Sequence, residues 1–287
     1  MIPAPPFFAQ YQAQVEAELR RLVPIAGAGV QQSMAYTLHA PSKLVRPVLT
    51  LLTAELCGGS GARALPVAAA VEMVHASSLI LDDLPSMDDA PLRRGKPSNH
   101  REFGEAIAIL AAFGLLNNAF GTIAREYRGP LATDLAALLS DAVGLDGLIA
   151  GQAADLLATD QQITFQMLER IHRGKTGALF VAAATAGAVT AAAGPEPIAA
   201  LAAFAKNLGL AFQIIDDLLD VEGDPADTGK ATRTDVKKTT FVSFSGVGGA
   251  HQLAAELCAT ADTALSPFGP RADRLRELSA FVAARNA

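Results

Sequence analysis

Apolar positions recur along most of this chain with the 3.6-residue period of amphipathic helices, and alanine is frequent within these stretches. Gly and Pro cluster at 58–61 and 194–197, where we expect loops. The pattern predicts an all-α fold of antiparallel helices around a central cavity. No linker rich in Pro, Gly or Ser and no internal repeat divides the 287 residues, so we expect a single domain over residues 1–287.

Two runs without charged residues, at 106–124 and 176–195, approach the length that crosses a bilayer. The first contains Asn117 and Asn118, and the second consists mostly of Ala, Gly and Thr, which insert weakly into membranes. A helix that is apolar on all sides but does not face lipid is a buried helix. We therefore expect no membrane span. The N-terminus lacks the basic and apolar regions of a signal peptide, which predicts a cytoplasmic protein.

Charge and cysteine content exclude two further classes of function. The formal net charge of −6 gives no footprint for nucleic acid, and we expect no nucleic-acid partner. The two cysteines, Cys57 and Cys258, lie in unrelated apolar contexts without the spacing of a metal site. They are expected to be reduced core thiols.

Two clusters of aspartates about 130 residues apart interrupt the apolar pattern: Asp82, Asp83, Asp88 and Asp89 in the first, and Asp216, Asp217 and Asp220 in the second. Carboxylates crowded into an apolar wall repel one another and lose hydration, so that a cation is needed to neutralise them. A set of oxygen ligands without His or Cys favours Mg²⁺, which proteins hold with one or two carboxylates together with substrate phosphates. The clusters therefore predict a phosphorylated substrate.

The spacing within the clusters supports a shared site. Asp216 and Asp220 are separated by one helical turn and share a face, whereas Asp217 points about 100° away. Pro85 disrupts the helix after the first pair of aspartates, so that Asp88 can turn back toward the same cavity.

Basic residues follow the first cluster directly, at Arg93, Arg94 and Lys96. Cations placed just beyond an acidic metal site suit a diphosphate whose oxygens are shared between the metal and a guanidinium. An isolated acidic pair would more simply be a solvated helix face. Two such clusters flanked by apolar runs, one of them followed by RRGK, favour the metal site.

Five blocks of this sequence resemble those of the trans-isoprenyl diphosphate synthases, and within that family the bacterial geranylgeranyl diphosphate synthases of carotenoid pathways. SKLVRP, DDLPSMDDAPLRRGKP, GLIAGQAADL, IHRGKTGALF and AFQIIDDLLD are similar to family blocks and occur in the family's order. The resemblance runs from about residue 40 to about residue 245. The first aspartate motif has the form with two extra residues between the aspartates.

The resemblance implies a metal-assisted prenyl transfer. Mg²⁺, three ions with substrate bound, would be held by Asp82, Asp83, Asp88, Asp216, Asp217 and Asp220. The diphosphate of an allylic substrate (dimethylallyl, geranyl or farnesyl diphosphate) would also be bound by Arg93, Lys175, Lys230 and Lys238. The allylic cation left by ionisation would be stabilised by carbonyls at a helix break near Lys175, by the Thr176 hydroxyl and by the Gln213 amide.

The second substrate implied is isopentenyl diphosphate, bound by Lys43, Arg46, His75 and Arg94. Leu44 stands where the family usually has an arginine, which puts one surface contact in doubt. Carbon–carbon bond formation would be followed by loss of a proton to the released diphosphate. The resemblance also implies a homodimer in which the helix over 106–124 packs against its partner.

Product length depends on the depth of the tail pocket. Family members that stop at C15 commonly carry an aromatic residue five positions before the first aspartate, where this chain has Ser77. One helical turn rises about 5.4 Å, roughly one isoprene unit, so Ser77 predicts a C20 product. Met73 and Val74, with Phe113 or Phe120 from the neighbouring helix, would form the floor, although ordinary core packing would also explain either phenylalanine.

The leading interpretation is thus a geranylgeranyl diphosphate synthase, with a farnesyl diphosphate synthase as the near alternative. A class I terpene cyclase shares the ionisation step but usually has one DDxxD motif and a cavity rich in aromatic residues, whereas the aromatic content here is 6%. A non-catalytic partner subunit would be expected to have lost aspartates or basic anchors. Both are present in this chain.

Overall fold

The structure is a computed structural model that describes residues 4–25, 27–222 and 239–284. It is all-α apart from one two-stranded hairpin, which confirms the predicted fold class. Along the chain the elements are α1 (Pro6–Leu22), α2 (Val30–Leu38), α3 (Val45–Leu56), α4 (Gly61–Asp82), β1 (Leu92–Arg93), β2 (Lys96–Pro97), α5 (Asn99–Phe103), α6 (Glu105–Glu126), α7 (Gly129–Val143), α8 (Leu148–Ala158), α9 (Phe165–His172), η1 (Arg173–Gly177), α10 (Ala178–Thr190), α11 (Pro195–Glu222), α13 (Phe241–Ala264), η2 (Ser266–Ala272) and α14 (Asp273–Ala283).

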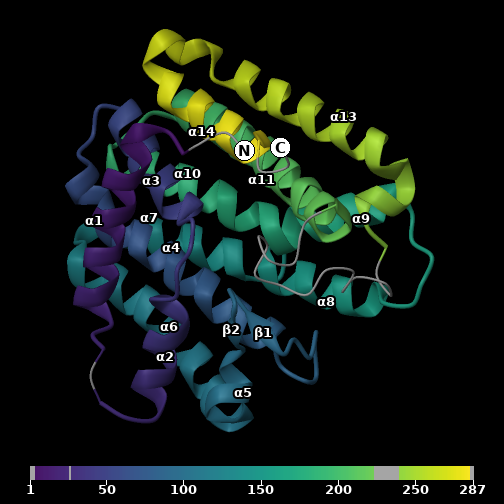
Figure 1. The fold of residues 1–287 in the computed structure, drawn as a ribbon. Coiled ribbons are helices and arrows are strands. Elements are labelled where there is room, and N and C mark those ends of the chain that lie inside the picture. Colours follow the sequence, from purple (N-terminus) through teal and green to yellow (C-terminus); the bar gives the residue numbers. More distant parts are fainter. Residues whose placement is uncertain (1–3, 26, 223–238, 285–287) are drawn as a thin grey trace.

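The core lies between α3, α4, α6, α10 and α11, and the remaining helices cover it (Figure 1). Helix α13 runs along α11, α1 flanks α3 and α4, and Phe8 of α1 packs against Phe281 of α14. Helix α11 begins at Pro195, so the loop expected over 194–197 is shorter than predicted. Proline is accepted in the first turn of a helix because its missing N–H would have no partner there.

Helices α4 and α6 approach closely because small side chains line their contact. Ala108, Ala111 and Ala112 of α6 are buried, and the Ser77 hydroxyl of α4 donates a hydrogen bond to the Ala112 carbonyl over 2.9 Å. An alanine surface lets backbones come near each other with little side-chain entropy lost. The pair therefore forms one wall that runs the length of the bundle.

Three helices, α4, α6 and α11, are long and apolar enough to cross a membrane by length and composition alone. The first charge-free run predicted from the sequence falls in α6, and the second is divided between η1 and the 13-residue α10. The most apolar window of α4 is 67% buried within the bundle. Burial by protein accounts for its apolar character, as expected for a core helix.

Strands β1 and β2 form an antiparallel hairpin that pairs Arg93 with Lys96. The two residues between them, Arg94 and Gly95, have φ values of 54° and 74°. Positive φ at both central positions is the geometry of a tight hairpin turn, which glycine adopts easily and arginine does not. The hairpin follows the first aspartate motif directly and holds Arg93 and Arg94 beside it.

Candidate active site

The first aspartate motif begins where α4 ends. The Asp88 N–H donates to the Asp82 carbonyl over 2.9 Å, so the chain turns back after Asp82 as Pro85 predicted. Burial raises the pKa of Asp82 to about 6, and the nearby Asp88 carboxylate adds to the rise while Lys175 opposes it. A carboxylate in this setting is stabilised by an added cation.

Asp83 is held by a basic residue of the same motif. Its side chain is 2% exposed and forms a two-pronged ion pair with Arg93, whose Nε lies 3.0 and 3.2 Å from the two carboxylate oxygens. Asp83 thus holds the Arg93 guanidinium next to Asp82, and its assignment as a metal ligand stays a prediction. Asp89 lies in an ion pair with Arg101 at 3.1 Å.

The second motif occupies the last two turns of α11. Asp216 and Asp220 are half-buried, one turn apart, as the spacing predicted. Asp217 is buried and accepts hydrogen bonds from Gln213 Nε2 at 3.0 Å and from the Phe241 N–H at 2.9 Å. Both oxygens thus serve donors of the protein, and the assignment of Asp217 as a metal ligand stays a prediction.

A helix break lies where the sequence predicted one, near Lys175. Residues Arg173–Gly177 form a π-helical turn, η1, between α9 and α10. Lys175 Nζ lies 2.7 Å from Asp155 Oδ2, and the Thr176 hydroxyl donates to Gln213 Oε1 over 2.8 Å. Since Lys175 also acts on the pKa of Asp82, and Gln213 precedes Asp216 by one turn, both aspartate motifs meet at η1.

The residues that remain suit Mg²⁺ shared with a substrate. In the described part of the chain, no three Asp, Glu, His or Cys side chains gather closely enough to hold a metal ion by themselves. Mg²⁺ does not need such a cage, because substrate phosphates and water complete its octahedron. The half-buried Asp82, whose desolvated carboxylate is stabilised by an added cation, and the oxygen donors of Asp88, Asp216 and Asp220 fit this ion.

Two of the residues predicted for isopentenyl diphosphate are in contact. Arg46 Nη1 lies 3.4 Å from His75 Nε2, and the Arg46 guanidinium lies 4.4 Å from the Phe180 ring centroid. The aromatic ring holds the flat guanidinium in place. Lys43 is exposed, with its Nζ 6.0 Å from the ring centroid of Phe281 in α14, so the structure does not place it beside Arg46.

Two acidic residues of the site were missed from the sequence. Glu72 is buried with its Oε1 3.8 Å from Arg94, and burial raises the pKa of this carboxyl while Arg94 and Arg46 lower it. Asp155 pairs with Lys175, as noted above. Glu72 lies one turn before His75 in an apolar helix, and Asp155 lies in the GLIAGQAADL block, which are the signals that would have revealed them.

Of the residues proposed for product length, Met73, Val74 and Ser77 are all buried in α4. Phe113 is not: its side chain is 62% exposed on the outer face of α6. The prediction that Phe113 forms the floor is wrong for a single chain, because α6 turns this residue away from α4. Phe120 packs against the core, so ordinary packing accounts for it. Lys230 and Lys238 lie outside the described residues.

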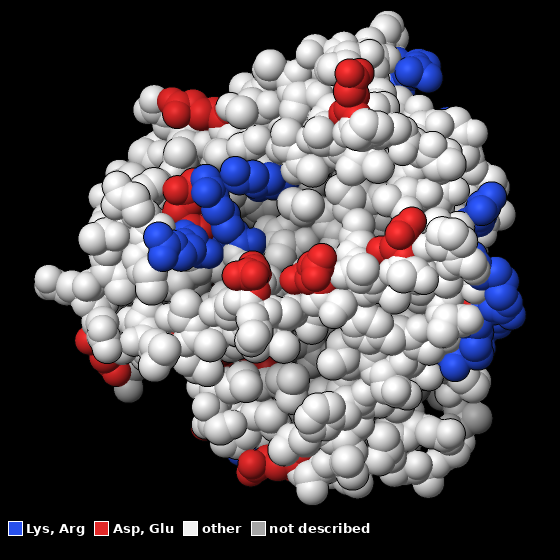
Figure 2. All heavy atoms as spheres, turned by 180° about the vertical axis from the view of Figure 1, so that it is seen from behind, with Lys and Arg blue, Asp and Glu red and all other residues white. Residues whose placement is uncertain are grey.

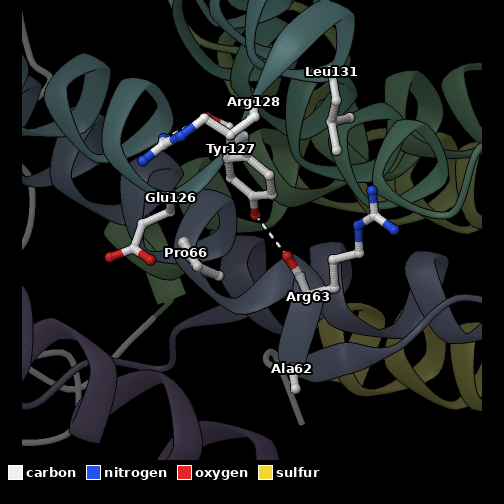
Figure 3. A pocket seen from close by; sticks show the side chains of 7 residues that line it. All are labelled: Ala62, Arg63, Pro66, Glu126, Tyr127, Arg128 and Leu131. Carbon is white, nitrogen blue, oxygen red and sulfur yellow. Dashed lines mark hydrogen bonds between the residues drawn. The ribbon is translucent and has the colours of Figure 1, made fainter.

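A cavity of about 410 Å³ lies at the other end of α4 from the aspartates (Figure 3). It is lined by the first turns of α4, the end of α6 and the start of α7. The Tyr127 hydroxyl donates to the Arg63 carbonyl over 2.7 Å and accepts from the Val67 N–H over 3.2 Å. The Tyr127 hydroxyl thus bridges the Val67 N–H and the Arg63 carbonyl, which would bond to each other directly in a regular helix, and it joins α4 to α6. This cavity belongs to the scaffold.

On the face drawn in Figure 2, acidic and basic side chains gather together beside a hollow, and a separate group of basic side chains lies along the right-hand edge.

Comparisons with known proteins agree with this geometry. The family model for polyprenyl synthetases matches residues 28–251. A farnesyl diphosphate synthase of Geobacillus stearothermophilus is 43% identical over 254 residues, which cover 86% of this chain and 86% of that protein. The chloroplastic geranylgeranyl pyrophosphate synthase 11 of Arabidopsis thaliana is 40% identical over 283 residues, 95% of this chain and 79% of that protein.

Solved structures share the whole fold. The apo FPP/GFPP synthase of Zymomonas mobilis superposes with a TM-score of 0.86 at 32% identity, covering 97% of this chain and 98% of that one. A geranyltransferase of Helicobacter pylori, complexed with magnesium and isoprenyl diphosphate, gives 0.84 at 26% identity, with 98% of each chain covered. The chain therefore belongs to the polyprenyl synthetase family and is a trans-prenyltransferase that condenses isopentenyl diphosphate with allylic diphosphates.

Proposed function

We propose that this enzyme is a geranylgeranyl diphosphate synthase of the bacterial carotenoid type, whose main product is C20. The observation that carries the reaction is the meeting of both aspartate motifs at η1, where Lys175 lies near Asp82 and Thr176 is bound to Gln213. A C15 synthase, which shares every part of this site, is the second candidate.

The diphosphate of the allylic substrate lies between the ends of α4 and α11. Asp82, Asp88, Asp216 and Asp220 would hold Mg²⁺, three ions with substrate bound, and the bound metal lowers the basicity of the departing diphosphate. Arg93, oriented by Asp83, and Lys175, oriented by Asp155, add positive charge where the leaving group gains negative charge. Lys230 and Lys238 would contribute from outside the described residues.

Ionisation breaks the bond between C1 and the diphosphate oxygen, and both electrons leave with the oxygen. The resulting allylic cation needs oriented oxygen dipoles in a dry pocket. The π-helical turn at Lys175 and Thr176 supplies carbonyl oxygens outside the regular helical pattern, together with the Thr176 hydroxyl. These oxygens act on the cation without forming a bond to it.

Isopentenyl diphosphate lies on the other side of the cavity, against Arg46, His75 and Arg94. Glu72 pairs with Arg94 and also interacts with Arg46, so its carboxylate offsets the repulsion between the two guanidinium groups. The double bond of this substrate attacks C1 of the allylic cation, and the new tertiary cation loses a proton to the released diphosphate. Lys43 would reach the diphosphate only after leaving the Phe281 ring.

The small side chain of Ser77 supports the C20 product. It is 4% exposed, and its hydroxyl hydrogen bond to Ala112 keeps α4 and α6 close, with Met73 and Val74 buried below. An aromatic side chain at this position would occupy space along the wall. The relatives above include synthases of both product lengths, so the proposal rests on the small side chain at this position.

We further propose a cytoplasmic homodimer, with no membrane span and no nucleic-acid partner. Helix α6 presents Ile109, Leu110 and Phe113 on its exposed face, a row of apolar side chains that a second copy would cover. The proposal of no membrane span is supported by α4, whose most apolar window is 67% buried by the protein itself.

Chain-length analysis of the products tests this function. Purified protein is incubated with Mg²⁺, labelled isopentenyl diphosphate and, separately, dimethylallyl, geranyl and farnesyl diphosphate. A dominant C20 product from all three primers is expected. A C15 endpoint would retain the mechanism and contradict the pocket depth, whereas no elongation from any primer would contradict the proposed function.

A further inference from the structure

A chain of hydrogen bonds runs from the start of α13 through Asp217 to the π-helical turn. The Phe241 N–H donates to Asp217 Oδ2 over 2.9 Å, and Gln213 Nε2 donates to Asp217 Oδ1 over 3.0 Å. The Thr176 hydroxyl then donates to Gln213 Oε1 over 2.8 Å. The three side chains come from α11 and η1, and Phe241 is the first residue of α13.

The chemistry of the groups fixes the direction of each bond. A backbone N–H can only donate, and an ionised carboxylate can only accept. The amide nitrogen of Gln213 must therefore face Asp217, which turns the amide oxygen toward Thr176. The Thr176 hydroxyl has one hydrogen, and it is given to that oxygen. What its oxygen can offer to any other neighbour is a lone pair.

We propose that Asp217 is a positioning residue that sets this direction, so that the Thr176 oxygen presents lone pairs, and never its proton, to the allylic cation. The inference rests on the proposed function, because it assigns a purpose to the orientation only if a cation forms beside η1. It also explains why the middle aspartate of the second motif is turned away from the face of Asp216 and Asp220.

One isosteric substitution reverses the chain. In Asp217→Asn the new oxygen must still accept from the Phe241 N–H, so the new amide nitrogen faces Gln213. Gln213 then has to flip and present its nitrogen to Thr176, whose hydroxyl now accepts and frees its hydrogen toward the cavity. A proton dipole aimed at a cation opposes ionisation. We expect the single-turnover rate to fall about 100-fold, the size of effect that one misdirected dipole has in other active sites.

A second substitution restores the direction. In Asp217→Asn with Gln213→Glu, the introduced amide at position 217 donates to one oxygen of the introduced carboxylate at position 213, and Thr176 donates to the other. The total charge of the pair equals that of the wild type. We expect the double variant to recover most of the rate lost by Asp217→Asn. In a Thr176→Val background, Asp217→Asn should cost no further rate, since its effect passes through the hydroxyl.

The competing explanation, that Asp217 is a metal ligand, predicts other results. Binding of inorganic pyrophosphate with Mg²⁺, measured by the rise in unfolding temperature, should require the same Mg²⁺ concentration in Asp217→Asn as in the wild type and a higher one in Asp216→Asn. Each of three results would overturn the proposal. One is a higher Mg²⁺ requirement in Asp217→Asn, and another is a double variant that does not recover the single-turnover rate. The third is an Asp217→Asn substitution that slows the Thr176→Val enzyme as much as it slows the wild type.

A neutron crystal structure tests the inference independently of activity. The deuterium of the Thr176 hydroxyl is expected to point at Gln213 in the wild type and away from it in Asp217→Asn. A deuterium that points away in the wild type refutes the proposed direction even if the enzyme elongates prenyl chains. A correct orientation in a protein that elongates none would instead refute the proposed function.

Discussion

At the scale of single residues, similar aspartates have unlike roles because their partners differ. Asp82 and Asp83 are neighbours, yet Asp83 is buried against Arg93, whereas Asp82 is half-buried and desolvation raises its pKa. In the second motif Asp217 is buried and accepts hydrogen bonds from Gln213 and the Phe241 N–H, whereas Asp216 is half-buried. Aspartates of one motif therefore differ in their surroundings.

Asp82 should destabilise the enzyme at neutral pH when no metal is bound. Its pKa of about 6 exceeds the ordinary 3.8, so the folded state holds a proton that the unfolded state releases. The stability that the protonated Asp82 side chain gives to the folded state is complete below pH 4 and is lost as the pH rises through 6. In metal-free buffer at pH 7.5, Asp82→Asn is expected to raise the free energy of unfolding by roughly 1 to 3 kcal/mol.

Urea unfolding at pH 4 and pH 7.5 measures this effect, with the exposed Asp134→Asn in α7 as the matched control. The gain should vanish at pH 4 and be absent in the control at both pH values. An equal gain at both pH values would show that charge burial is not its cause.

Ser77 provides a second test at this scale. Ser77→Phe or Ser77→Tyr places a ring at the contact between α4 and α6, where the hydroxyl now binds Ala112. The ring has to fill the tail pocket or separate the helices. We expect the main product to change from C20 to C15, by loss of about one isoprene unit of depth.

Product chromatography with labelled isopentenyl diphosphate and geranyl diphosphate as the C10 primer reads out this change. Ser77→Ala, which removes the hydroxyl without adding bulk, is the control and should retain C20. If Ser77→Phe is folded and still makes C20, the wall at Ser77 does not limit the product.

At the scale of elements, the active site depends on close contacts between backbones. A Cβ added at Gly151 of α8 would lie 2.1 Å from the backbone nitrogen of Lys175, and one added at Gly209 of α11 would lie 3.1 Å from the Cα of Gly177. Helices α8 and α11 thus pack against η1, with glycines at both contacts. The turn that carries Lys175 and Thr176 keeps its place through this packing.

Gly151→Ala should therefore damage both stability and activity. No side chain can yield at this contact because the opposing atoms are backbone. We expect a loss of roughly 3 kcal/mol in the free energy of unfolding, the upper part of the usual range for overpacking, and a large fall in kcat as η1 shifts. Thermal unfolding and steady-state kinetics measure the two effects.

Gly248→Ala is the matched control, because a Cβ at this position of α13 has no atom within 4 Å. It should stabilise the helix by up to about 1 kcal/mol and leave kcat unchanged. Similar results for the two glycines would contradict the importance of the contact with η1.

At the scale of the whole molecule, apolar side chains remain uncovered on one chain. In addition to the row on α6, two leucines are exposed: Leu145, between α7 and α8, is 83% exposed, and Leu157 of α8 is 75% exposed. Single exposed apolar residues are normal, but a row along one helix marks a contact surface. The proposed homodimer would bury the row that includes Phe113.

Phe113→Glu should weaken this dimer, because two-fold symmetry places the introduced charge in the interface from both copies. Sedimentation velocity over a range of protein concentrations should show a shift toward monomer. Ile25→Glu, which changes another exposed apolar residue, should leave the association state as it is. A wild type that sediments as a monomer at all concentrations would exclude the dimer.

The sequence by itself determined the fold class, the two aspartate motifs and the turn after the first of them. Each is a local property: helical period, residue spacing, and the effect of Pro85 on the chain that follows. The resemblance added the helix break near Lys175 and the roles of Arg46, His75, Thr176 and Gln213, and the structure brings the last four residues into two contacting pairs.

Only the tertiary structure decided which donors surround each charged group. It paired Asp83 at the end of α4 with Arg93 of β1, and Asp217 with the start of α13, 24 residues further along the chain. It also exposed Phe113 and revealed Glu72 as the partner of Arg94. Helical spacing fixes which face a residue occupies, but the neighbour opposite that face comes from another segment. That choice depends on how the helices pack.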